Sequence, residues 1–212
     1  MAVAPADRIA ALPDGMDPHL AAALPQSGAI ALAAVKELKN GQRLLVIGAG
    51  GGTGALLLPM AREIAGHITA VDSAEKSSVM MQLGADVTID YRQTDFTKTG
   101  ENWDCIIDLA ATRTAWQVRK SLSEHGRYIV FGGAMKSLLT ALATPKCSVG
   151  QADGSPRVLQ QLSDLFSDGR LMPEIVSKLS LEDAASGLQD VGEGKVAGKI
   201  VVIPGTTKVG ES

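Results

Sequence analysis

Seven residues, Gly48 to Gly54, restrict the fold of this chain more than any other segment, because five of them are glycine. They follow an apolar run, residues 43–48, that is typical of a strand, and they lead into residues 53–65, which have a helical pattern. So tight a turn from strand to helix needs positive φ, which glycine adopts without strain. Glycine also lets backbone N–H groups approach an anion at the helix N-terminus. The segment therefore predicts a strand–turn–helix unit that can hold a phosphate group.

The rest of the chain alternates between short apolar runs and helical segments. Strands are expected at 67–72, 86–90, 103–109 and 127–131, with a weaker one at 146–151, and helices at 74–83 and 112–123. The strand segments are apolar throughout, so both faces of the sheet should be covered by helices. Right-handed crossovers then give an α/β fold with a doubly wound parallel sheet, the Rossmann fold.

The segments at both ends of this core are also readable. Asp17 and Pro18 predict the N-cap and first turn of a helix that continues to Gly41. We divide the chain into a dinucleotide-binding unit over 1–170, a strand–helix–strand segment over 171–204 and a loose tail over 205–212.

Composition excludes several classes of partner. The chain has 212 residues, with 20 Lys and Arg against 23 Asp and Glu, and no basic stripe, so we expect no nucleic-acid partner. No apolar stretch reaches the length of about 18 residues that a membrane span needs, so we expect none. Cys105 and Cys147 form no CxxC pair. We therefore expect a reducing, cytoplasmic compartment.

An acidic residue supports a dinucleotide interpretation of the glycine-rich turn. Asp72 follows Gly54 by 18 residues and ends the next predicted strand, where it would accept hydrogen bonds from ribose hydroxyls. Two spacings fit the turn: Gly50, Gly52 and Ala55 match GxGxxA, whereas Ala49, Gly51 and Gly54 match AxGxxG.

Two alternatives to a dinucleotide site stay open. The turn could serve packing alone in a protein without a cofactor, or it could belong to a methyltransferase, which also pairs a glycine-rich turn with an acid after the second strand. A P-loop is excluded, because no Lys-Ser or Lys-Thr pair follows the glycines.

Taken in order, six segments resemble the medium-chain dehydrogenase/reductase superfamily, in its zinc-independent, quinone-oxidoreductase-like branch. They are residues 2–35, 41–54, 82–92, 103–110, 126–133 and 192–203. The resemblance implies two domains, with a GroES-like catalytic domain before the cofactor domain. Met1 falls where that catalytic domain should be ending, so the chain resembles a truncated form. Residues 171–204 would then be a C-terminal remnant of the catalytic domain.

The resemblance also implies which residues hold the cofactor. The diphosphate would lie at the glycine-rich turn, on Ala49, Gly51, Gly52, Thr53 and Gly54. The adenosine ribose would be surrounded by Asp72, Ser73 and Lys76, with Tyr91 near the adenine. Leu109 and Ala110 would line the path to the nicotinamide, and Phe131, Gly132 and Gly133 would lie against the nicotinamide itself. No catalytic residue is identified. No metal is expected, because His19, His67 and His125 are scattered.

The choice between NAD and NADP stays open. Asp72 would repel a 2′-phosphate and favours NAD. Ser73, Lys76 and Tyr91 resemble the positions that hold the 2′-phosphate in NADPH-using members. Two departures remove polar anchors near the nicotinamide: Ile30 stands where the family commonly has threonine, and residues 109–111 replace Asn-Val-Gly.

Three hypotheses on function follow. The first is an NAD(P)H-dependent reductase of a small carbonyl, enone or quinone, working as a homodimer through the edge strand near 146–151. The second is a non-catalytic dinucleotide-binding module, either a sensor or the partner of another chain. The third is a folded but inactive product.

Overall fold

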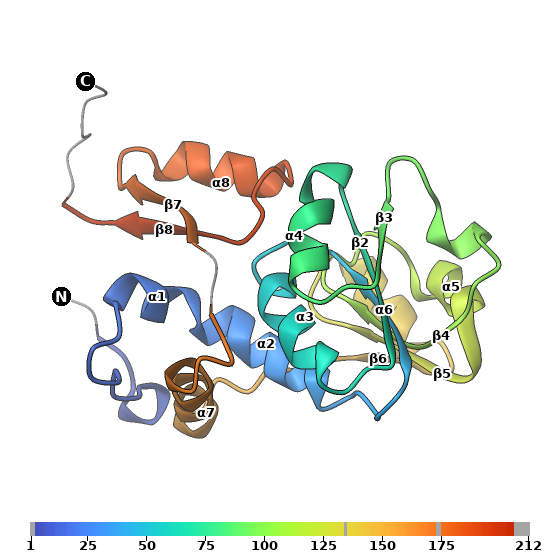
Figure 1. The fold of residues 1–212 in the computed structure, drawn as a ribbon, viewed down its shortest axis with the longest axis horizontal. Helices are drawn as coiled ribbons and strands as arrows, with labels where there is room; N and C mark the ends of the chain where they lie inside the picture. Colours follow the sequence, from blue (N-terminus) through green and yellow to red (C-terminus); the bar gives the residue numbers. More distant parts are fainter. Residues whose placement is uncertain (1–2, 134, 173–174, 206–212) are drawn as a thin grey trace.

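The computed structural model describes residues 3–133, 135–172 and 175–205. Its centre is a six-stranded parallel sheet (Figure 1). The strands are β1 (Arg43–Ile47), β2 (His67–Asp72), β3 (Val87–Asp90), β4 (Trp103–Asp108), β5 (Leu122–Val130) and β6 (Cys147–Val149). They lie in the order β3-β2-β1-β4-β5-β6, which confirms the predicted doubly wound sheet, the Rossmann fold. The order reverses between β1 and β4, where folds of this type form their ligand crevice.

Both faces of the sheet are buried, because successive residues of a central strand pack into apolar clusters on opposite faces. In β1, Leu44 and Val46 pack into one cluster, and Leu45 and Ile47 into the other. The first cluster lies under α2 (Pro25–Val35), α3 (Gly54–Arg62), α4 (Ser77–Gln82) and α7 (Pro156–Ser167). The second lies under η3 (Phe96–Lys98), α5 (Ala115–Val118) and α6 (Met135–Leu142).

Helix boundaries differ from the predictions where proline or a strand intervenes. The helix expected from Pro18 to Gly41 is two helices, α1 (Pro18–Ala23) and α2, and it ends at Val35. Pro25 has no N–H to continue the hydrogen bonds of α1, so a new helix begins there. The predicted helix 112–123 shrinks to α5 and the 3-10 turn η4 (Arg119–Ser121), because β5 already begins at Leu122.

The smaller elements complete the chain. A 3-10 turn, η1 (Ala6–Arg8), precedes α1, and the helix expected over 74–83 forms as η2 (Ala74–Lys76) followed by α4. Within the described ranges, no helix is both long and apolar enough to cross a membrane.

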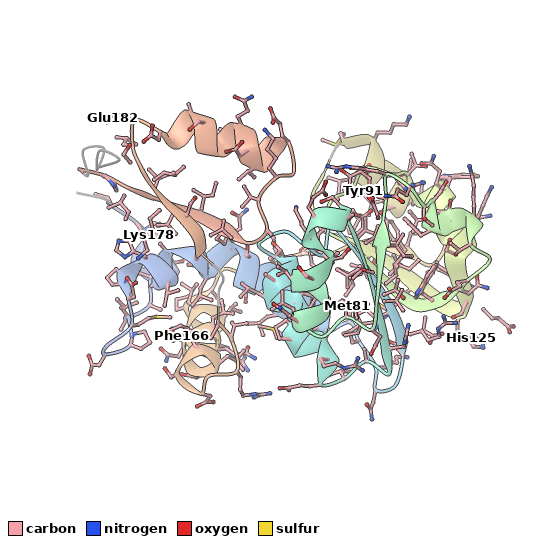
Figure 2. All side chains as sticks on the ribbon, turned by 45° about the horizontal axis from the view of Figure 1, so that its top comes forward. Met81, Tyr91, His125, Phe166, Lys178 and Glu182 are labelled. Carbon is pink, nitrogen blue, oxygen red and sulfur yellow. The ribbon has the colours of Figure 1, made fainter. Side chains whose placement is uncertain are left out.

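The C-terminal segment forms a second, two-stranded parallel sheet. Its elements are β7 (Ile175–Ser180), α8 (Ala184–Gly192) and β8 (Lys199–Ile203), a strand, a helix and a strand in the order that the sequence predicts. This unit lies beside α1 (Figure 1), and Lys178, labelled in Figure 2, is 3.6 Å from the Asp17 carboxylate that caps α1. The tail predicted at 205–212 lies, apart from Gly205, outside the described residues.

Candidate functional site

The glycine-rich turn follows β1 and is tied to the end of β2. The N–H groups of Gly48 and Ala49 both donate to the carbonyl oxygen of Val71, at 2.9 and 3.2 Å. Gly48 has φ +79°, the left-handed conformation that the turn requires. Gly54 opens α3 so close to Ala49 that an added Cβ would lie 2.0 Å from the Ala49 carbonyl oxygen. The backbone itself therefore demands glycine at positions 48 and 54.

Gly51 is different, because folding does not require it to be glycine. An added Cβ would meet only the Gly48 carbonyl oxygen, at an ordinary 3.5 Å. Gly51 also forms an isolated parallel bridge with Gly198, which immediately precedes β8. The C-terminal unit thus returns to the glycine-rich turn.

Lys199 lies directly over this turn. An added Cβ on Gly52 would be 2.7 Å from both Cδ and Cε of Lys199. The lysine is half-buried, its burial lowers the pKa of the ammonium, and it has no ion-pair partner in the part of the chain that the structure describes. Sequence analysis missed Lys199, since the run from Gly198 predicts a strand but not that this strand meets the turn. The arrangement supplies a free cation beside the backbone N–H groups of α3.

Asp72 ends β2 under the same turn and is held by three groups. Its Oδ2 accepts a hydrogen bond from the Gly50 N–H at 2.9 Å, and its Oδ1 accepts one from the Ser73 N–H at 2.8 Å. The Lys76 ammonium is 3.3 Å from Oδ1, and both side chains are nearly buried. An added Cβ on Gly50 would lie 2.5 Å from Cδ of Lys76. The ion pair and the turn therefore fix each other.

A cavity of about 480 Å³ opens at the carboxyl ends of β1, β2 and β4. Six predicted cofactor residues line it: Gly51, Asp72, Lys76, Tyr91, Leu109 and Ala110. Nine further residues line it that were not in the predicted set: Ile47, Gly48, Val71, Phe96, Thr112, Arg113, Val191, Gly192 and Gly194. The last three come from the end of α8 and the residues after it, so the C-terminal unit closes one side of the cavity.

The remaining predicted residues lie around the cavity rather than in its wall. Ala49, Ser73 and Gly54 are buried, and the Thr53 hydroxyl donates to the hydroxyl of Ser27 in α2 at 3.1 Å. Tyr91, labelled in Figure 2, is half exposed at the rim.

Two arginines flank the rim of the cavity. The Arg92 guanidinium lies 5.6 Å from the centre of the Tyr91 ring, and that of Arg113 lies 5.1 Å from the centre of the Phe96 ring. Arg113 is also paired with Asp95 at 3.0 Å. Aromatic rings and guanidinium planes of this kind suit contact with a flat heterocycle.

Asp108 ends β4 but faces the protein interior. Its Oδ2 accepts a hydrogen bond from the hydroxyl of Tyr128 at 2.8 Å, and its Oδ1 accepts from the N–H groups of Ala110 and Ala111 at 3.0 and 2.7 Å. Burial raises the pKa of the Asp108 carboxyl and also that of the Tyr128 hydroxyl. Asp108 therefore shapes the turn after β4, in which Ala111 has φ +50°.

The three residues predicted against the nicotinamide follow β5 and do not line the cavity. Phe131 is buried, and an added Cβ on Gly150 would lie 2.4 Å from its ring. An added Cβ on Gly133 would lie 2.1 Å from Cβ of Ala111, so this segment touches the turn after β4. Gly132 is exposed, with φ +78°.

The histidines of the described chain lie on separate elements. His19 is in α1, His67 begins β2 and His125 is in β5. No group of three or more His, Cys, Asp or Glu side chains among the described residues is placed to hold a metal ion.

Comparison with known proteins points to one family. A family model for zinc-binding dehydrogenases matches residues 83–202, which is more than half of the chain. The chain is 30% identical over 174 residues to the quinone-oxidoreductase QR1 of Triphysaria versicolor, covering 77% of this chain and 53% of the relative. It is 29% identical over 189 residues to an NAD-dependent alcohol dehydrogenase of Sulfolobus acidocaldarius, covering 83% and 55%. The chain thus spans about half the length of these two curated relatives.

Solved structures agree with this match. The quinone oxidoreductase of Coxiella burnetii superposes with a TM-score of 0.76 at 25% identity, covering 85% of this chain and 59% of that one. The structure of AibC gives a TM-score of 0.77 at 25% identity, covering 95% and 65%. Sequence and structure together show that the chain belongs to the zinc-binding dehydrogenase family, within the medium-chain dehydrogenase/reductase superfamily that its motifs resemble.

Proposed function

We propose that this chain holds the dinucleotide of an NAD(P)H-dependent oxidoreductase that reduces a small carbonyl, enone or quinone. The observation that carries the proposal is that the glycine-rich turn, the end of β2 and the C-terminal unit all contribute residues to one cavity. The open face of Gly51, the Asp72–Lys76 pair and the end of α8 all line it. Lys199 lies over the same turn and forms no ion pair with any residue that the structure describes. Relatives named as quinone oxidoreductases and an alkenal/one oxidoreductase support the class of substrate.

The residues fit the parts of such a cofactor. Gly51, Gly52 and the first N–H groups of α3 would face the diphosphate, and the Lys199 ammonium would neutralise part of its charge. The adenosine ribose would lie at Asp72, and Tyr91 and Arg113 would flank the adenine. The Leu109–Ala110 turn would lead toward the nicotinamide.

We further propose a preference for NADH over NADPH. Lys76 is already paired with Asp72, so this end of the cavity offers a 2′-phosphate no uncompensated cation from that pair. A ribose hydroxyl can donate to a carboxylate, whereas a phosphate dianion beside Asp72 is repelled.

A reduced nicotinamide, when bound, supplies a hydride to an electrophilic carbon. This chain's residues would position the ring and exclude water, because Leu109 and Ala110 are apolar. Asp108 would hold their turn through the Ala110 and Ala111 N–H groups and would not exchange a proton with substrate.

Steady-state oxidation of NADH and NADPH with a panel of quinones and enones tests the catalytic proposal. We expect turnover above the protein-free rate, faster with NADH. If the protein binds NADH but the rate with every acceptor equals the protein-free rate, the catalytic proposal is overturned and the proposal of cofactor binding stands.

The second candidate function is a non-catalytic dinucleotide-binding module or subunit. The observation that favours it lies at the proposed nicotinamide end of the cavity. There the side chains of Leu109 and Ala110 carry no proton donor, and the nearby Asp108 carboxylate faces the protein interior. NADH binding without turnover, with activity appearing only when a second protein is added, would select this candidate.

We also propose that the chain pairs with a second copy through β6. This strand is at one edge of the six-stranded sheet, and the neighbouring α6 exposes Met135, Leu139 and Leu142. Light scattering after size exclusion should give twice the mass of one chain, and the mass of a single chain would contradict the pairing.

A further inference from the structure

A second hollow, of about 350 Å³, lies at the opposite end of the sheet from the cofactor cavity. Its walls are Arg119 and Lys120 of η4, Leu122 at the start of β5, and Pro145 and Lys146 just before β6. Parallel strands all begin at one edge of the sheet, so this hollow lies at the amino ends and the cofactor cavity at the carboxyl ends. Figure 2 labels Tyr91, which lines the cofactor cavity, well apart from His125 of β5, the strand whose first residue lines the hollow.

The hollow collects positive charge in a chain whose net charge is −3. Three of its five wall residues, Arg119, Lys120 and Lys146, are cations. None of the three forms an ion pair with a carboxylate of the described residues, whereas many other Lys and Arg side chains of the protein do. Cations gathered in a concave surface raise the local positive potential and attract an anion.

Arg119 has an aromatic neighbour in α5. Its guanidinium lies 5.5 Å from the centre of the Trp116 ring. Burial raises the pKa of the Cys147 thiol, and the charge of Arg119 opposes this shift. A planar guanidinium presents its donors in a fixed fork, which suits the oxygens of an oxyanion.

Lys146 occupies a backbone conformation that suits glycine better. Its φ is +65°, and its carbonyl oxygen accepts the Tyr128 N–H at 2.9 Å, which fixes it beside β5. Its ammonium donates to the carbonyl oxygen of Glu124. A lysine in this left-handed conformation is uncommon, and its long side chain brings a cation to the wall of the hollow.

We propose that this hollow binds the phosphate group of a small phosphate monoester. A guanidinium fork and two ammonium groups match the several oxygens of a phosphate, and charge-assisted hydrogen bonds of this kind are the strong ones. The volume falls in the range of small-molecule sites, so the organic part of the monoester also has room. The site is separate from the cofactor cavity and does not rest on the proposed function.

The two tryptophans of the chain provide a direct readout. Trp116 stacks with Arg119, whereas Trp103 is fully buried and donates to the Thr69 hydroxyl. Titration of the ¹⁵N-labelled protein with inorganic phosphate, against chloride at matched ionic strength, should shift the Trp116 indole resonance saturably and leave that of Trp103 unchanged. Saturating NADH should not block the shift, which separates this site from the cofactor diphosphate. No saturable shift of Trp116 would overturn the proposal.

Variants separate phosphate binding from folding. Lys146→Gly relieves the left-handed strain, so it should keep or raise the melting temperature while weakening phosphate binding about tenfold. The double change Arg119→Ala with Lys120→Ala should remove the saturable shift. Lys36→Ala deletes an exposed lysine elsewhere and should leave phosphate affinity unchanged. Equal phosphate affinity in wild type, Lys146→Gly and the double variant would show that the hollow is not the site.

Discussion

Asp72 and Asp108 occupy matching places in the fold, yet they have different surroundings. Each ends a strand beside β1: Asp72 ends β2, and Asp108 ends β4 and pairs in register with Ile47. Asp72 lines the cavity and is paired with Lys76. Asp108 is fully buried and receives the Tyr128 hydroxyl and two backbone N–H groups.

This difference separates a residue that can meet a ligand from one that shapes the backbone. The position at the carboxyl end of a strand is common to both, so it does not by itself identify a binding residue. Each carboxylate accepts two backbone N–H groups. What decides the role is whether the carboxylate lines the cavity and whether its third partner is a cation or a buried hydroxyl. In the proposed function, the adenosine end of the cavity is therefore polar and can bind ligand hydroxyls. The nicotinamide end is an apolar turn whose backbone is hydrogen-bonded to Asp108 on its buried side.

The largest expected effect comes from separating the turn from Asp72. Gly54→Ala places a Cβ 2.0 Å from the Ala49 carbonyl oxygen, so the start of α3 must move and carry Gly50 away from Asp72. We expect a loss of about 3 kcal/mol or more in the free energy of unfolding, measured by urea denaturation. Gly192→Ala, whose Cβ would meet nothing within 4 Å, is the control and should be close to neutral. If both variants were equally stable, the close approach of Gly54 to the Ala49 carbonyl oxygen would be contradicted.

The second largest effect is expected from loss of the Tyr128 hydroxyl, which donates a hydrogen bond to Asp108. Tyr128→Phe removes the hydroxyl that donates to Oδ2 of Asp108 and leaves a buried carboxylate short of one hydrogen bond. The free energy of unfolding should fall by about 1–3 kcal/mol. In an Asp108→Asn background the same change should cost less, because no charge remains to be stabilised. Equal costs in the two backgrounds would show that the pair is not coupled.

The third effect concerns the choice of cofactor. Asp72→Asn removes the negative charge from the place where we propose that the adenosine ribose lies, and it releases Lys76 from its ion pair. We expect the ratio of NADPH to NADH affinity to rise about tenfold, measured by fluorescence titration. Glu101→Gln, which removes an exposed charge at the other end of the sheet, should leave the ratio as it is. An unchanged ratio in Asp72→Asn would reject Asp72 as the selector.

The smallest expected effect is a pH dependence carried by Asp108. Its pKa is raised by burial, so the folded protein binds this proton more readily than the unfolded chain does. The stabilisation from protonation is present at low pH and is lost as the pH rises through the raised value. Relative to Asp108→Asn, wild type should therefore gain stability as the pH falls from neutral toward 4. A constant difference between the two proteins across that range would contradict the raised pKa.

Local sequence signals predicted the sheet well and the site in part. The strand at 67–72 has the predicted bounds, because an apolar run flanked by turn residues has few alternatives. The strand–turn–helix pattern pointed to Gly51 and Asp72, and the family resemblance added Lys76; all three line one cavity. Lys199 could not be placed over Gly52 in this way, since no local pattern tells where a distant strand will pack. The inward orientation of Asp108 depends on Tyr128 of the neighbouring strand, which is equally non-local.

The central claim is that the open face of Gly51 receives a dinucleotide, and an NADH titration tests it most directly. NADH fluorescence should show saturable binding to wild type. Gly51→Ala should weaken that binding about tenfold or more at an unchanged melting temperature, because its Cβ meets only one atom of the protein, at 3.5 Å, and otherwise enters the ligand's space. Absence of NADH binding to wild type, or equal affinity in the two proteins, would contradict the account.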